Sequence, residues 1–161
     1  MGDRAPASFT LYHTRGHEED IVRALVGYGF ANASWQDPKI ADVVEGARFS
    51  VDEASMGILE ELGPEFEAMG VAYYGAQDGK YEYDGMARLY TPELGAREFT
   101  ASQDGSIWVD SAAVGLITDK LRYANSHGEV AAEASRIIAE LDTVSGRAWT
   151  GALESLKLLA R

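Results

Sequence analysis

The sequence predicts an α+β fold: a mainly antiparallel sheet with two ferredoxin-like strand-helix units, central β-hairpins and a C-terminal helical segment. Three patterns point to this class. Strand-like alternation followed by helical spacing occurs twice in the first half. Two Asp-Gly pairs lie between strand-like runs in the middle. The last third places its apolar residues at helical spacing. At 161 residues, the chain is expected to form a single domain over 1–161.

The first strand-helix unit is expected between residues 8 and 29. Residues 8–14 alternate and are rich in aromatic and β-branched side chains, which is typical of a strand. Apolar residues then recur at helical spacing over 17–28, and Gly27 and Gly29 end that helix. The polar residues 1–7 are expected to form a flexible tail.

The second unit repeats the first at an offset of forty residues, with Phe49 in the place of Phe9. Residues 47–52 alternate as a strand, and 55–69 have helical spacing with an expected break or kink at Gly63-Pro64. A strand at 71–76 follows, so 8–76 holds two similar β-α units. Such units suggest a ferredoxin-like arrangement, whose second strand would lie near 31–36 or 40–44.

The segment 77–110 is expected to form hairpins and the segment 111–161 helices. Asp-Gly turns at 78–79 and 104–105 would join 71–76 to 80–90 and 96–102 to 106–110. With a loop at 91–95, this makes three or four antiparallel strands between 71 and 110. Breaks at 125–128 and Gly146 divide the last segment into three one-sided helices, the first capped by Ser111.

The residue content excludes several kinds of chemistry. The chain has no cysteine, so disulfides, thiolate metal sites and cysteine nucleophiles are absent. Phosphate-binding glycine loops and the common serine or zinc hydrolase motifs are also missing. We therefore expect no cofactor and favour a non-enzymatic protein. Since the sequence has neither an apolar run of about 20 residues nor a signal-peptide core, the expected location is the cytoplasm.

The charge points to a basic protein partner. A net charge of −12 repels nucleic acid and anionic membranes and attracts basic proteins. No Lys or Arg occurs between Arg48 and Lys80, and the helix at 55–69 is expected to turn its glutamates to solvent. A plain solvated helix face explains the same pattern. The candidate partner-binding residues are Asp52, Glu53, Glu60, Glu61, Glu65 and Glu67, with Tyr81 and Tyr83 as aromatic anchors.

In its small size, strong negative charge and lack of cysteine, the chain resembles the acidic inhibitors encoded by phages, plasmids and toxin operons. This resemblance of composition implies an anti-defence or immunity protein that covers a basic surface. A nuclease, or another nucleic-acid-binding protein, is the kind of target that such a DNA mimic would block.

A regulatory domain for a small anionic metabolite is the first alternative. Arg88 and Arg97 flank the loop at 91–95, and with Tyr90 they form a candidate pocket for a carboxylate or phosphate. Ion pairs with Glu93 and Glu98 would explain the two arginines without any ligand.

A metal-dependent enzyme is the second alternative. His13, His17 and Asp20 are weak candidate metal ligands, because two histidines four residues apart can converge on one ion. The acidic residues at 18–20 equally suit the first turn of a helix, where carboxylates interact favourably with the helix dipole.

Overall fold

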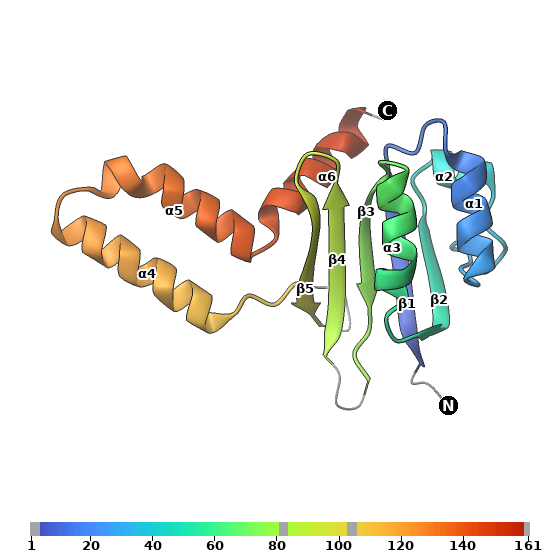
Figure 1. Ribbon diagram of the computed structural model, residues 1–161, viewed down its shortest axis with the longest axis horizontal. Helices are drawn as coiled ribbons and strands as arrows, with labels where there is room; N and C mark the ends of the chain where they lie inside the picture. Colours follow the sequence, from blue (N-terminus) through green and yellow to red (C-terminus); the bar gives the residue numbers. More distant parts are fainter. Residues whose placement is uncertain (1–3, 81–83, 103–105, 160–161) are drawn as a thin grey trace.

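The computed structural model describes residues 4–80, 84–102 and 106–159 and confirms the α+β class (Figure 1). One antiparallel sheet has the strand order β2-β1-β3-β4-β5. The strands are β1 (Arg4–Tyr12), β2 (Arg48–Ser55), β3 (Ala72–Gln77), β4 (Gly85–Thr91) and β5 (Gly95–Ala101). The helices are α1 (Glu18–Gly27), α2 (Ile40–Val44), α3 (Ile58–Ala68), α4 (Ser111–Ser126), α5 (Val130–Val144) and α6 (Arg147–Leu159).

Strand β1 lies between β2 and β3 and is antiparallel to both. Phe9 is therefore paired with Phe49 on one side and with Gly75 on the other. Because β2 and β3 both oppose β1, they run parallel to each other, and α3 crosses over β1 to join them. The two predicted strand-helix units are thus both present on one sheet.

The two units also end in the same way, as the aligned sequences indicate. Gly29 and Gly70 have left-handed φ angles of 79° and 69°. The next residues, Phe30 and Val71, donate their backbone N–H to the carbonyl five residues earlier, both at 2.9 Å. This is the Schellman arrangement, which closes a helix and turns the chain inward. Both residues after the glycine are buried.

No strand forms at 31–36 or at 40–44, so that expectation is wrong. Residues 40–44 form α2, because the Asp42 carboxylate accepts the backbone N–H of Lys39 and Val43 is buried beneath. In 31–36 the only pairing is an isolated bridge between Ala31 and Ser50. The ferredoxin-like detail is therefore not confirmed.

Strand β1 also begins earlier than expected, within the predicted tail. Ala5 and Ala7 are buried, and the register with β2 shifts between them, at Pro6. A strand tolerates proline at such an irregularity because the ladder is interrupted there, and no neighbouring carbonyl needs the N–H that proline lacks. The Pro6 carbonyl accepts the backbone N–H of Asp78 at 2.9 Å. A flexible tail over 1–7 is thus wrong for residues 4–7, and residues 1–3 lie outside the described chain.

Helix α3 continues through Pro64, so the helix is not broken at Gly63-Pro64. The glycine is explained by packing. A Cβ at position 63 would lie 2.5 Å from the Tyr73 hydroxyl and 3.0 Å from Nε of Arg88. Only glycine permits this close approach of α3 to the sheet.

The meander β3-β4-β5 confirms antiparallel strands in the middle of the chain, with β4 and β5 joined through residues 92–94. The predicted turn at 78–79 is wrong, because Gln77 pairs with Met86 and β4 begins only at Gly85, so the connection runs through residues 81–83. After β5, Ile107 forms a single bridge to Ala101 rather than a strand. Tyr81, Tyr83 and the predicted turn at 104–105 lie outside the described residues.

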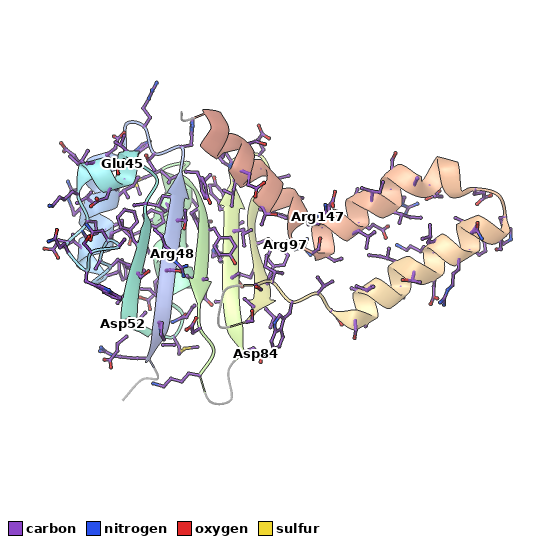
Figure 2. The ribbon with its side chains drawn as sticks, turned by 180° about the vertical axis from the view of Figure 1, so that it is seen from behind. Glu45, Arg48, Asp52, Asp84, Arg97 and Arg147 are labelled. Atoms are coloured by element: carbon purple, nitrogen blue, oxygen red, sulfur yellow. The ribbon has the colours of Figure 1, made fainter. Side chains whose placement is uncertain are left out.

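The sheet carries an apolar core on each face. On one face, under α1, α2 and α3, the Phe9 ring contacts Phe30, Phe66 and Tyr73 edge to face, with centroids 5.3 to 5.5 Å apart. On the other face, α6 packs Trp149 against Phe99 of β5. This second core is confined to the side of β3, β4 and β5 and to the end of β1. The rest of β1 and all of β2 carry no helix on that face within the described chain (Figure 2).

The three C-terminal helices are confirmed, although Asp110 and not Ser111 caps the first. The Asp110 carboxylate accepts the backbone N–H of Ala112 at 2.9 Å. Helices α4 and α5 pack on each other and extend away from the sheet (Figure 1). Lys120 and Glu140 join them by an ion pair of 2.7 Å. Among the described helices, none is both long and apolar enough to cross a membrane.

We predict that Phe9→Ala lowers the free energy of unfolding by about 3–5 kcal/mol, because it empties the centre of the larger core. Equilibrium urea unfolding measures this change. The control Val44→Ala, at a side chain that is 62% exposed, should change stability by less than about 0.5 kcal/mol. Equal effects of the two substitutions would contradict the central place of Phe9.

Candidate functional site

The layer formed by α1, α2 and α3 concentrates the negative charge of the protein. Residues 15–47 and 56–69, which hold these helices and their loops, contain ten Asp and Glu against three Arg and Lys. Glu60, Glu61 and Glu65 are exposed on α3. The Tyr28 hydroxyl, at the end of α1, donates to Glu65 at 3.1 Å and so ties the two helices together. The exposed carboxylates of α3 therefore lie beside the acidic helix α1.

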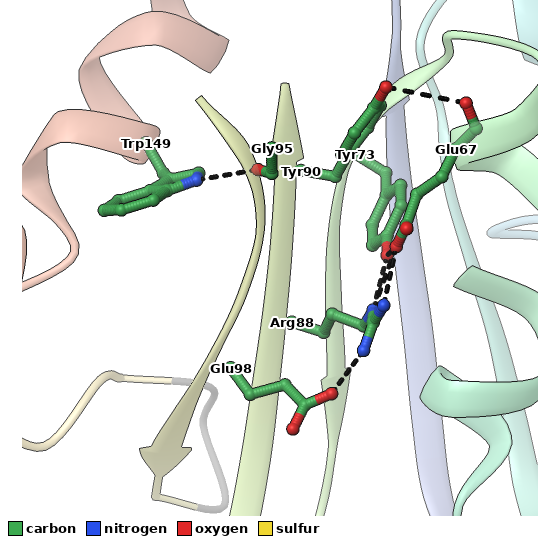
Figure 3. Close-up of polar contacts among 7 residues, drawn as sticks. All are labelled: Glu67, Tyr73, Arg88, Tyr90, Gly95, Glu98 and Trp149. Atoms are coloured by element: carbon green, nitrogen blue, oxygen red, sulfur yellow. Dashed lines mark hydrogen bonds and ion pairs between the residues drawn. The ribbon is translucent and has the colours of Figure 1, made fainter. Parts of the chain in front are cut away.

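Glu67 is placed differently from the other glutamates of α3. Its Oε1 accepts hydrogen bonds from the Tyr73 hydroxyl at 2.6 Å and from Nη2 and Nε of Arg88 at 2.8 and 3.0 Å (Figure 3). The side chain is only 22% exposed. Its carboxylate thus fastens α3 to β3 and β4 and is already engaged within the chain.

Arg88 completes this network between α3 and the sheet. Its side chain is 15% exposed, and its Nη1 donates to Glu98 on β5 (Figure 3). Desolvation would lower the pKa of Arg88, but hydrogen bonds with Glu67 and Tyr73 outweigh it and raise the pKa. Burial, and then the hydrogen bond to Glu67, raise the pKa of Tyr73 well above 10.0. The network therefore holds a fixed cation between two carboxylates and a neutral phenol.

The predicted anion pocket is not assembled, because Arg97 lies on the opposite face of the sheet from Arg88. The Arg97 guanidinium stands 5.7 Å from the Phe99 ring and 5.5 Å from the Trp149 ring, under α6. Tyr90 stays on the Arg88 side, where it stacks on Tyr73 at 5.9 Å. Arg88 pairs with Glu98, as the ligand-free interpretation of the sequence anticipated.

The histidine alternative also lacks a common site. His13 is exposed with a φ of 56°, His17 precedes α1, and Asp20 is paired with Arg23 at 2.8 Å. The described residues contain no group of three or more His, Asp or Glu that could hold a metal ion. Glu18 accepts the Gly16 backbone N–H at 2.9 Å, which places it in the helix-start role.

A shallow hollow of about 240 Å³ lies on the open face of β1 and β2, and the sequence patterns did not indicate it. It contains one basic and two acidic side chains, Arg48, Asp52 and Asp78. Figure 2 shows Arg48 and Asp52 on this uncovered part of the sheet. Desolvation raises the pKa of Asp78, although Arg48 acts against it. The remaining lining residues are Pro6, Ala7, Ser8, Trp35, Ser50, Val51 and Ala76.

A fixed loop presents Trp35 beside this hollow. The Asn32 side-chain oxygen accepts the backbone N–H groups of Ser34 and Gln36 at 3.0 and 3.1 Å. The Asn32 amide nitrogen donates to Asp42 at 3.1 Å, which anchors the loop to α2. Trp35 itself has a left-handed φ of 55° and is 63% exposed. The sequence patterns give this residue no role in a site, because nothing local marks it as part of one.

The fold and these sites define an acidic α+β protein with an antiparallel five-stranded sheet, a charged helical layer on one face and an open polar strip on the other. No protein-family model, no curated protein and no solved structure matches this chain.

We predict that Glu67→Gln lowers the free energy of unfolding by about 1.5–3 kcal/mol, because it removes the charge that pairs with the mostly buried Arg88. Urea unfolding is the measurement. Glu61→Gln, on the exposed side of the same helix, is the matched control, with an expected change within about 0.5 kcal/mol. If Glu67→Gln changed the free energy of unfolding no more than Glu61→Gln does, the network would not be what fastens α3 to the sheet.

We also predict that stability decreases as the pH rises above about 10. The folded pKa of Tyr73 lies above its unfolded value of 10.0, so the folded state retains a proton that the unfolded state releases. Urea midpoints measured from pH 9 upward test this. Tyr73→Phe should flatten the decrease without abolishing it, because the pKa values of Tyr12 and Tyr28 are also raised. If Tyr73→Phe lost stability with rising pH as steeply as the wild type, a group other than Tyr73 would cause the decrease.

Proposed function

We propose that this protein is a non-enzymatic acidic binding protein that covers a basic surface of a protein partner in the cytoplasm. The supporting observation is the α1–α3 layer, where Glu60, Glu61 and Glu65 are exposed on α3 and Glu65 is joined to the end of α1 through Tyr28. Such a surface speeds the approach of a basic protein and disfavours acidic ones. A nuclease or another nucleic-acid-binding protein is the kind of partner it suits, as for phage and plasmid anti-defence proteins.

The spacing of the carboxylates supports this choice of partner. Successive turns of α3 are about 5.4 Å apart, on the same scale as the roughly 3.4 Å that separates phosphates along a nucleic-acid strand. The helix fixes the backbone from which these charges extend, so less backbone order is lost when the partner binds than for a disordered segment. Asp52 and Glu53 are left out of the proposed contact, because Asp52 lines the hollow on the opposite face of the sheet and Glu53 pairs with Arg4 at 4.0 Å.

Not every partner-binding residue that was expected from the sequence belongs to this surface. Glu67 is left out of the proposed contact because its carboxylate already binds Tyr73 and Arg88. Tyr81 and Tyr83 remain proposed anchors outside the described residues, and the proposal does not depend on them. The metabolite alternative has less support, since the Arg88 guanidinium is occupied by Glu67 and Glu98.

The test is a charge reversal on the exposed face of α3. We expect the triple variant Glu60→Lys, Glu61→Lys and Glu65→Lys to lose most of the basic proteins that the wild type captures from a host lysate at about 50 mM salt. Captured proteins should also be released from the wild type at about 500 mM salt, where charges are screened beyond about 4 Å. Mass spectrometry identifies and quantifies what is retained.

A matched control separates the face from the total charge. Glu93, Glu129 and Glu154 are exposed and lie away from α3, so their triple reversal to lysine changes the net charge by the same amount. This control should keep the captured partner. If both triple variants lose it equally, only the bulk charge matters and the proposed face is wrong. Capture that does not respond to salt would also contradict the proposal.

A further inference from the structure

The hollow on the open face is built from three neighbouring strands in register. Ser50, Ser8 and Ala76 lie side by side across β2, β1 and β3. Because their side chains are small, they form the floor of the hollow. One step along, on the same face, Arg48 lies beside Thr10. In the other direction lie Asp52 at the β2 edge and Asp78, whose backbone binds Pro6. The hollow therefore has a basic end at Arg48 and an acidic end at Asp52 and Asp78. The acidic end reaches from β2 to β3, which is twice the strand spacing, or about 10 Å.

The charges lining this hollow do not balance. Arg48 supplies one positive charge, and its Nη2 donates to the Ser8 hydroxyl at 2.9 Å. Within the described residues it forms no ion pair with Asp52 or Asp78, although its charge acts on Asp78 at longer range. Two carboxylates against one guanidinium leave one negative charge in a partly desolvated place. A single positive group from outside would neutralise it.

Trp35 supplies a flat, exposed ring to the lining of the same hollow. A left-handed backbone is unfavourable for a non-glycine residue, and the exposed indole gains little burial in return. The loop holds it in place through the two backbone hydrogen bonds to Asn32. An indole face attracts cations, and a ring fixed in advance loses little entropy when one binds.

The size of the hollow limits what can occupy it. Its volume of about 240 Å³ lies below the roughly 300–1,000 Å³ of pockets that enclose drug-sized molecules. The space suits one planar or compact head group with a short apolar stem. A nucleotide or a large metabolite would extend far outside it.

From this geometry we infer that the hollow is a binding site for one organic cation, an alkylammonium or guanidinium group, held by Asp52 and Asp78 with its stem against Trp35. The group comes either from a free small amine or guanidine or from a Lys or Arg side chain of a bound protein. The inference is independent of the proposed function, because the hollow lies on the sheet face opposite to α1–α3.

The test is an NMR titration of the whole chain with ethylguanidinium and with ethylurea, its neutral analogue of the same shape. We expect ethylguanidinium to shift the Trp35 indole and the backbone amides of Ser8 and Ser50, and to leave the Trp149 indole unchanged. Ethylurea should shift none of them. Equal responses to the two compounds, or no response to either, would overturn the inference.

Variants assign the contacts. Asp52→Asn with Asp78→Asn should weaken ethylguanidinium binding about tenfold or more, the effect of losing charged hydrogen bonds. Trp35→Ala, followed through the Ser8 and Ser50 amides, should weaken it about threefold. Glu53→Gln, an exposed neighbour on β2 that does not line the hollow, is the matched control and should bind as the wild type does. A loss in this control equal to that in the double variant would mean that only the overall charge attracts the cation.

A second pair of ligands distinguishes the two sources of the group. The peptide Gly-Gly-Arg-Gly-Gly is compared with its citrulline analogue. If the arginine peptide binds at least as well as ethylguanidinium, the site takes a protein side chain. If only the free cation binds, it takes a small molecule. Binding of the citrulline peptide as strong as that of the arginine peptide would contradict a cation site altogether.

Discussion

The double pairing of β1 is the constraint on which the other features depend. With β2 and β3 on its two sides, α3 has to cross over β1, and the crossing brings Glu67 above Tyr73 and Arg88. Alternation along the same strand sends Phe9 into the core under the helices and Ser8 to the open face. The buried network and the polar hollow are thus formed on the two sides of one strand.

The network also answers a problem in α3 itself. The helix ends with acidic residues and has no base in its last turn, an arrangement that the helix dipole disfavours. Arg88, reaching up from β4, supplies the missing positive charge from the sheet. Gly63 leaves room for this approach. A helix rich in carboxylates can therefore pack closely on the sheet while Glu60 and Glu61 stay exposed.

Features encoded in local patterns were predictable from the sequence, and features that depend on distant partners were not. The two strand-helix units, the glycines that end their helices and the three C-terminal helices follow from spacing and capping within a few residues. The place of Pro6 at the irregularity of β1, the close packing that requires Gly63 and the separation of Arg88 from Arg97 depend on which strands become neighbours. The hollow is the extreme case, because its lining comes from three strands and a loop.

The arm of α4 and α5 affects how the protein moves through solution. A compact chain of this length has a radius of gyration of about 15 Å. Two helices that extend beyond the sheet (Figure 1) increase this radius and the friction without adding mass. A monomer of 17.4 kDa will therefore elute early from a sizing column, at the position of a heavier sphere. Mass has to be measured by light scattering or sedimentation equilibrium before elution volume is interpreted as self-association.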